Sequence, residues 1–173
     1  MGEWVLDKNN IILIGMPGAG KSTIGVVLAK MLRMDFCDTD LIIQKNTGRA
    51  LQEIIDNDGL DYFLECECKT VTELGCENCV IATGGSVVLK KEAIEHLRAL
   101  GNVIYLRATF DKIESRIHNI DTRGIAFKEG QTLFDIYNQR TPLYENACDF
   151  IVDVGDFNPA ITCEKIKEKV NVI

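Results

Sequence analysis

The residues best suited to chemistry lie in one glycine-rich run, Gly15-Met16-Pro17-Gly18-Ala19-Gly20-Lys21-Ser22-Thr23. The run is a complete G-x-x-x-x-G-K-[ST] sequence, the P-loop, whose glycines let backbone N–H groups surround a phosphate at the start of a helix. Lys21 can reach the outer phosphates as a point charge, and the hydroxyl of Ser22 is a ligand that Mg²⁺ accepts. We therefore predict that ATP phosphates bind along Gly18, Ala19, Gly20, Lys21, Ser22 and Thr23, with Mg²⁺ at Ser22.

The segments that flank this run have the periodicity that the motif requires. Residues 10–14 form an apolar run of strand length, and residues 21–33 carry apolar side chains at helical spacing. A strand, a glycine loop and a helix in this order confirm a P-loop more strongly than its letters alone. Further strands are expected at 35–37, 79–83, 102–106 and 150–153, and further helices at 40–46, 50–56, 60–74, 90–100, 110–117, 132–146 and 159–170.

The alternation of strand and helix patterns predicts an α/β protein. Strands separated by helices pair in parallel, and helices then cover both faces of the sheet. We expect a three-layer fold with a parallel five-stranded sheet, in one domain that spans residues 1–173, since no linker divides the chain. Ligands collect at the carboxyl ends of such strands. The P-loop, Asp38-Thr39-Asp40 and Gly84-Gly85 each follow a predicted strand directly, so they should meet there.

Composition and charge narrow the class of partner. The formal net charge of −7 disfavours binding to the phosphate backbone of nucleic acid. No apolar run approaches the ~18 residues of a membrane span, and the acidic N-terminus does not resemble a secretory signal. We expect a cytoplasmic, monomeric enzyme that acts on a small molecule, without nucleic acid or membrane partners.

Seven cysteines are present, four of them close together in sequence: Cys66, Cys68, Cys76 and Cys79. The second pair has the C-x-x-C spacing of zinc ligands. Cys66 and Cys68, however, are two residues apart in a predicted helix and would not face the same side. Small, reduced, buried thiols are the favoured interpretation, and a metal or redox role is left open.

Further motifs accompany the P-loop: Asp38-x-Asp40, Phe63-x-x-x-Glu67, Ile81-Ala82-Thr83-Gly84-Gly85, Arg116, Arg123, Arg140-x-Pro142-x-Tyr144 and Asn158-Pro159. In this set of motifs, the chain resembles the shikimate kinase family over nearly its whole length. The resemblance implies a P-loop kinase fold, with ATP and Mg²⁺ as cofactors and phosphoryl transfer to a hydroxyl of shikimate, a step of aromatic amino acid biosynthesis. It also implies an acceptor-binding region at about 38–75 and a lid at about 118–130.

The resemblance assigns a role to individual residues. It implies that Lys21, Asp40 and Arg123 are catalytic, with Arg123 brought to the transferring phosphoryl group by the lid. Mg²⁺ would be held by Ser22 and Asp38. The adenine ring would lie between Arg116 and the pair Asn158 and Pro159. The acceptor would contact Asp40, Gly84, Gly85 and Arg140, the last through a carboxylate that pairs with the guanidinium.

Three positions depart from the family pattern. Leu64 stands where the family usually has an arginine that clamps the acceptor's carboxylate, and Ser86 replaces the third of three glycines. Loss of one charge-assisted pair weakens an anion site by ~1.5–3 kcal/mol. Gly124 follows Arg123 where the family usually has proline, which predicts a looser hinge.

These departures leave alternatives for the function. The acceptor is shikimate or a different small hydroxy acid or polyol. A regulatory protein that binds nucleotide without catalysis is also possible, although it would have no need of Asp40, Arg123 and Arg140. A nucleoside monophosphate kinase would need more basic residues for its second phosphate-bearing substrate. Segment 38–70 offers only Lys45, Arg49 and Lys69, which disfavours that interpretation.

Overall fold

A parallel five-stranded sheet forms the centre of the molecule. In the computed structural model, which describes residues 9–117, 124–155 and 158–170, the strands lie in the order β2-β3-β1-β4-β5. All four neighbouring pairs are parallel. The strands are β1 (Asn10–Ile14), β2 (Asp35–Asp38), β3 (Cys79–Ala82), β4 (Gly101–Arg107) and β5 (Phe150–Asp153). The predicted α/β fold is confirmed.

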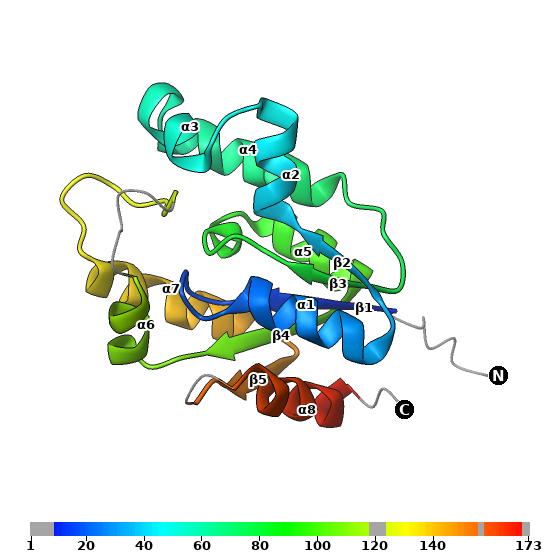
Figure 1. Cartoon of the computed structure of the whole chain (residues 1–173). Coiled ribbons are helices and arrows are strands. Elements are labelled where there is room, and N and C mark those ends of the chain that lie inside the picture. The colour runs from blue at the N-terminus through cyan, green and yellow to red at the C-terminus, as the bar shows by residue number, and fades with distance from the viewer. Residues whose placement is uncertain (1–8, 118–123, 156–157, 171–173) are drawn as a thin grey trace.

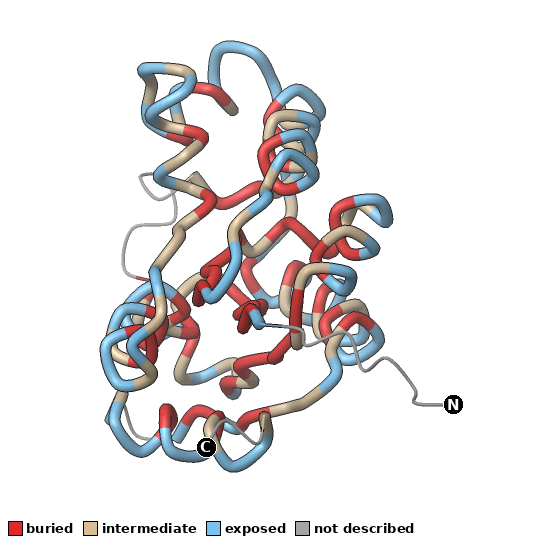
Figure 2. The backbone as a smooth tube through the Cα atoms, turned by 90° about the vertical axis from the view of Figure 1, so that its right-hand side faces the viewer, coloured by how far each residue is buried: buried red, intermediate tan, exposed pale blue. Residues whose placement is uncertain are grey.

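The central strands explain why the sheet is buried on both sides. Every residue of β1, with the sequence NIILI, and every residue of β3, with the sequence CVIA, is buried. Continuous apolar runs of this kind are typical of parallel strands covered by helices on both faces. Figure 2 shows the buried segments gathered in the interior, with exposed backbone around them.

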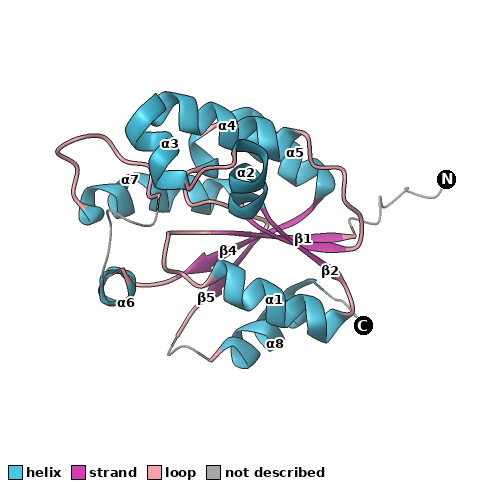
Figure 3. Ribbon diagram, turned by 45° about the horizontal axis from the view of Figure 1, so that its top comes forward, coloured by secondary structure: helices cyan, strands magenta, loops and turns pink. Residues whose placement is uncertain are grey.

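Helices form the two outer layers. α1 (Lys21–Leu32) and α8 (Pro159–Val170) cover one face, whereas α5 (Lys91–Leu100) and α7 (Leu133–Ala147) cover the other (Figures 1 and 3). The remaining helices are α2 (Thr39–Thr47), α3 (Leu51–Asp58), α4 (Leu60–Thr72) and α6 (Phe110–Arg116). The three-layer arrangement follows the prediction, and element boundaries differ from the expected ones by a few residues. The sequence patterns missed one short 3-10 helix, η1 (Val87–Leu89).

Helices α2, α3 and α4 pack around an apolar cluster of their own. It consists of Ile43, Leu51, Ile54, Phe63 and Ala126, with Ile55, Leu60 and Leu64 packed against it. Figure 1 shows these helices together at one side of the sheet, beyond the carboxyl ends of β2 and β3. Ala126 belongs to the segment that begins at Gly124, so this segment packs against the helices through the cluster.

The prediction for Gly124 needs a correction. Its φ is +62°, and a Cβ there would lie 2.4 Å from the Cβ of Leu51. Proline fixes φ near −65° and could not adopt this conformation. Glycine is therefore required here by backbone geometry and by a close approach to α3, and its presence does not by itself indicate a looser hinge.

In the part of the chain that the structure describes, no helix combines the length and the apolar character needed to cross a membrane.

Candidate functional site

The P-loop adopts the conformation that its glycines allow. Gly15, Gly18 and Gly20 have φ values of +147°, +82° and +95°. Gly20 caps α1 without a side-chain hydrogen bond, and the first turn of α1 contains no acidic residue. No carboxylate of this first turn competes for the amides, and the helix N-terminus favours an anion.

Lys21 is folded back against this loop and is only 8% exposed. Its Nζ donates hydrogen bonds to the carbonyl oxygens of Gly15, at 2.7 Å, and Met16, at 2.9 Å. Burial lowers the pKa of Lys21 to about 8, although the negative charges of Asp40, Asp38 and Glu67 act in the opposite direction. The site thus holds a buried amine that is mostly protonated at neutral pH.

Ser22 and Asp38 bring two oxygen ligands together beside the P-loop. The hydroxyl of Ser22 donates to Oδ2 of Asp38 at 2.6 Å, and Oδ1 of Asp38 accepts from the N–H of Asp40 at 3.0 Å. Asp38 is therefore also the N-cap of α2. A hydroxyl and a carboxylate beside a phosphate site are the hard oxygen donors that Mg²⁺ takes in nucleotide sites, so these residues fit the ion.

A cavity of about 590 Å³ opens beside the P-loop, at the carboxyl ends of the strands. Ten of the predicted site residues line it: Gly18, Gly20, Lys21, Ser22, Thr23, Asp40, Gly84, Gly85, Arg116 and Arg140. Four others do not: Ala19, Asp38, Asn158 and Pro159. Ala19 is fully buried, while exposed Asn158 accepts a hydrogen bond from the N–H of Ala160 at the start of α8. Arg123 and much of the predicted lid lie outside the described residues.

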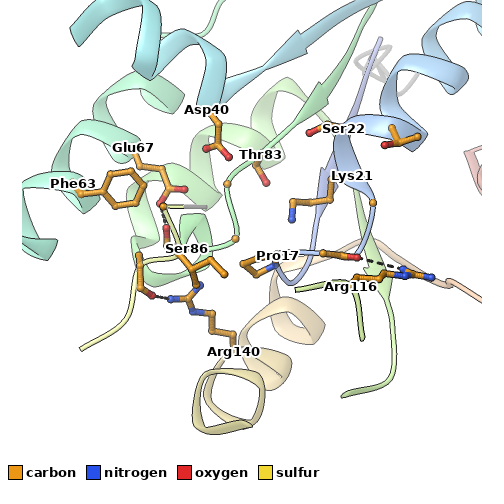
Figure 4. Close-up of a pocket in the computed structure, with 18 residues that line it drawn as sticks. Pro17, Lys21, Ser22, Asp40, Phe63, Glu67, Thr83, Ser86, Arg116 and Arg140 are labelled. Carbon is orange, nitrogen blue, oxygen red and sulfur yellow. Dashed lines mark hydrogen bonds between the residues drawn. The ribbon is translucent and has the colours of Figure 1, made fainter. Parts of the chain in front are cut away.

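Arg116 lies at the P-loop end of this cavity. One of its guanidinium nitrogens donates to the carbonyl oxygen of Gly18 at 3.3 Å (Figure 4). The planar guanidinium therefore lies beside the phosphate loop, where it can also stack on a flat ring.

Two buried carboxylates meet at the other end of the cavity. Asp40 Oδ1 and Glu67 Oε1 are buried and have no hydrogen-bond partner among the described residues. A Cβ on Gly84 would lie 2.1 Å from Glu67 Oε1 and 2.8 Å from Asp40 Oδ1, so both oxygens border the same glycine. Burial, together with the charge of Asp38, raises the pKa of Asp40 to about 6, while Lys21 acts in the opposite direction. Two free hydrogen-bond acceptors therefore share one small region.

Arg140 approaches the same region from α7 (Figure 4). It is only 2% exposed, and its Nη2 donates to the carbonyl oxygen of Ala126. Its Nε and Nη1 are buried without a partner in the described part of the chain. Nε and Nη1 point from different edges of the guanidinium, so each can donate separately to an oxygen of an anionic group.

The turn after β3 is held in place by side chains to which the sequence assigned no role. The N–H of Gly84 donates to Thr39 Oγ1 at 3.2 Å, and the hydroxyl of Tyr144 donates to the carbonyl oxygen of Gly85. The ring of Tyr144 in turn stacks on Tyr105 with the ring centroids 5.1 Å apart. These contacts fix the backbone that borders the two free carboxylate oxygens.

Glu67 and Ser86 also line the cavity, although neither was among the predicted site residues. A signal for Glu67 was present: it follows Phe63 by four residues, which places a carboxylate on the same helix face as a core aromatic residue. Leu64, by contrast, packs against the α2–α4 cluster and is absent from the cavity lining among the described residues. The two departures from the family pattern thus lie in different surroundings.

All seven cysteines are free thiols. Cys66 and Cys68 are half-buried in α4, and Cys79 is buried in β3. Within 9–117, 124–155 and 158–170, no group of three or more histidine, cysteine, aspartate or glutamate side chains is placed to hold a metal ion by itself.

Comparison with known proteins identifies the family of this chain. The family model described as shikimate kinase matches residues 17–171. A shikimate kinase of Clostridium botulinum is 40% identical over 149 residues, covering 86% of this chain and 89% of the relative. A shikimate kinase of Haemophilus influenzae is 38% identical over 169 residues, covering 95% and 94%.

Solved structures show the same likeness. Shikimate kinase from Acinetobacter baumannii, in complex with shikimate, superimposes with a TM-score of 0.87 at 29% identity, over 94% of this chain and 92% of that one. A deoxyadenosine kinase from M. mycoides, with a TM-score of 0.56 at 18% identity and coverage of 94% and 98%, shares the fold. Since the family model covers most of the chain and the relatives match nearly end to end, this protein belongs to the shikimate kinase family.

Proposed function

We propose that this kinase transfers the γ-phosphoryl group of ATP to a hydroxyl of shikimate. The observation that carries the proposal is the content of one cavity: Lys21 at the P-loop, free carboxylate oxygens beside Gly84, and the two free N–H groups of Arg140. A hydroxy acid presents the complementary groups. The relative from Acinetobacter baumannii was solved in complex with shikimate, which is such an acid.

The nucleotide binds at the P-loop end in this proposal. The amides at the start of α1 and the amine of Lys21 hold the phosphates, and Arg116 lies beside the adenine ring. Ser22 and Asp38 hold Mg²⁺, which when bound neutralises charge on the phosphates. Asn158 and Pro159 begin α8 away from the cavity lining, so their contact with adenine stays a prediction.

The acceptor binds at the opposite end. A charge-assisted hydrogen bond from Nε or Nη1 of Arg140 holds its carboxylate, while Oδ1 of Asp40 accepts the hydrogen bond of the reacting hydroxyl and takes its proton as the phosphoryl group transfers. Phosphoryl transfer depends mostly on positioning and charge neutralisation, so a base of modest strength is sufficient. Glycine is needed at both positions, because a Cβ on Gly84 would meet Glu67 and Asp40 and a Cβ on Gly85 would meet Pro17. A role for Arg123 at the transferring group stays a prediction.

The proposal is tested by the rate of ADP formation with Mg-ATP and shikimate. We expect kcat/KM above ~10⁴ M⁻¹s⁻¹, within the ordinary range for enzymes. Parallel reactions use other hydroxy acids and polyols. Turnover of another acid, without turnover of shikimate, would replace the substrate while keeping the reaction. ATP hydrolysis that no acceptor accelerates would contradict phosphoryl transfer altogether and favour a nucleotide-binding regulator.

The second candidate function is transfer to an acid other than shikimate, and the observation that favours it is the presence of Leu64. It supplies no cation, so within the described residues Arg140 and Lys21 are the cavity's cations near the two carboxylates. If shikimate is the acceptor, Leu64→Arg should lower the KM for shikimate about 10-fold, the effect of one added charge-assisted pair of ~1.5 kcal/mol. The neighbouring residue in α4, Phe63, lines the cavity.

Leu64→Gln is the matched control for this prediction, since it adds length and polarity without charge. Both variants lose apolar contact with the α2–α4 cluster, so both should unfold at a lower temperature. A KM for shikimate that is unchanged or raised in Leu64→Arg, at equal thermal stability of the two variants, would show that the cavity is shaped for another acid.

A further inference from the structure

Ser86 and Glu67 form a buried hydrogen-bonded pair in the wall of the cavity. Their exposed fractions are 3% and 1%, and the Ser86 hydroxyl donates to Glu67 Oε2 at 2.6 Å (Figure 4). Glu67 comes from α4, whereas Ser86 comes from the turn between β3 and η1. The bond therefore fixes a side chain of the α2–α4 unit to the turn that borders the acceptor end.

The second oxygen of Glu67 has no such partner. Oε1 is buried, unpaired among the described residues, and borders Gly84 next to Asp40 Oδ1. A buried acceptor atom without a donor is costly, and such atoms in folded proteins are commonly satisfied by water or by a ligand. Its position in the cavity wall makes a donor group on the acceptor the natural partner.

The groups around Glu67 show how strongly Ser86 affects the pKa of this carboxyl. Asp40 on α2 carries a like charge, while Arg140 on α7 and Lys21 on α1 carry opposite charges. Burial raises the pKa of Glu67 to about 7, and the Ser86 hydrogen bond is the largest influence in the other direction, ahead of Arg140 and Lys21. The serine therefore does more than either cation to keep this carboxylate ionised.

We propose that Ser86 is a positioning residue, which fixes one oxygen of Glu67 so that the other receives a hydroxyl of the acceptor beside the hydroxyl held by Asp40. The acceptor then carries two neighbouring hydroxyls as well as its carboxylate. This inference rests on the proposed function for the identity of the ligand. The pairing of Ser86 with Glu67 can be tested without any ligand.

The first test compares pH profiles of kcat/KM for shikimate in the wild type and in Ser86→Ala. Removing the hydroxyl raises the pKa of Glu67, so the acidic limb should move about one unit higher, equivalent to ~1.4 kcal/mol. The KM for shikimate should rise more than kcat falls, because the serine acts on acceptor binding. In a Glu67→Gln background the same serine substitution should leave the pH profile of kcat/KM unchanged, since the carboxyl that accepts the Ser86 hydrogen bond is gone.

The second test measures the free energy of unfolding against pH in the protein without ligands. Glu67 has a folded pKa of about 7, above its ordinary value of 4.5, so the folded state binds the extra proton and loses stability as pH rises between these values. Ser86→Ala extends this loss to higher pH. Its destabilisation should be larger at pH 8 than at pH 5 by ~1 kcal/mol, since at pH 8 the raised pKa is only partly passed.

Thr83→Val is the matched control for this second test. It removes another buried hydroxyl of the cavity wall, one that donates to the carbonyl oxygen of Leu13 at 3.0 Å. That carbonyl also accepts from the N–H of Thr83. Because a backbone carbonyl does not titrate, the destabilisation caused by Thr83→Val should be the same at both pH values.

The outcomes separate the two proposals. Identical pH profiles and a pH-independent destabilisation in Ser86→Ala would overturn the positioning role. A pH-dependent destabilisation, without turnover of any hydroxy acid by the wild type, would confirm the pairing and overturn both the proposed function and the assignment of Glu67 to acceptor binding. Both effects together would confirm the proposal.

Discussion

Replacing Lys21 with methionine should lower kcat by about 10²–10³-fold, the range seen when one preorganised donor to developing charge is removed. The amine of Lys21 is the cation of the P-loop and is held in place by the carbonyl oxygens of Gly15 and Met16. Methionine keeps most of the stem and removes the charge. In the proposed reaction, the transferring phosphoryl group then loses its nearest fixed cation among the described residues.

The same substitution should leave the fold intact. It removes a buried charge as well as two hydrogen bonds, and Met16 O still accepts from the N–H of Ala19 at 3.1 Å. We expect a change in unfolding free energy of about 1 kcal/mol, which shifts Tm by ~2–4 °C in a domain of this size.

The measurement is steady-state ADP formation with saturating Mg-ATP and shikimate, with Tm as the check on folding. Lys30→Met is the matched control, because Lys30 is an exposed lysine on the same helix. It should retain wild-type kcat. A Lys21→Met variant that folds and turns over at the wild-type rate would exclude the P-loop as the phosphoryl-transfer site.

Replacing Arg140 with lysine or methionine should raise the KM for the acceptor by about 10- to 100-fold, with a smaller effect on the KM for ATP. The loss corresponds to hydrogen bonds to a charged group, ~1.5–3 kcal/mol. Nε and Nη1 of this arginine have no partner among the described residues, and lysine keeps the charge without these guanidinium donors. Methionine also removes a positive charge near Glu67, which raises the pKa of that carboxyl further.

Two variants are needed because Arg140 is buried and also donates to Ala126. Arg140→Lys tests the guanidinium N–H donors while the charge stays, and Arg140→Met tests the charge. Arg98→Met is the control: Arg98 on α5 likewise donates to a carbonyl oxygen, that of Ala147, at 3.0 Å, away from the cavity. An unchanged KM for the acceptor in both Arg140 variants would place its carboxylate elsewhere.

The fold could be predicted because its determinants are local. An apolar run such as residues 10–14, followed by glycines and a helical pattern, specifies strand, loop and helix by periodicity and backbone preference alone. Parallel pairing then follows from the intervening helices, and the edge where ligands collect follows from the strand direction. For the same reason the P-loop, Asp40 and Gly84 were predicted to meet, and the structure brings them to one cavity.

Contacts between distant segments could not be predicted in this way. Ser86 and Glu67 are 19 residues apart, and their hydrogen bond exists only because α4 packs over the turn after β3. Leu64 and Ser86 both stood out in sequence, yet packing places one against an apolar cluster and the other in the cavity wall. Lys21 was expected simply to reach phosphates, and its lowered pKa comes from its burial, which only the folded structure shows.

By itself, then, the sequence determined three features: which loop is suited to phosphate, which residues follow the strands, and which layer architecture buries the apolar runs. Only the tertiary structure decided which polar atoms at the acceptor end have no partner within the described residues, namely Asp40 Oδ1, Glu67 Oε1 and two nitrogens of Arg140. The physical reason is that periodicity acts over a few residues, whereas burial and pairing of a side chain depend on elements that meet only after folding.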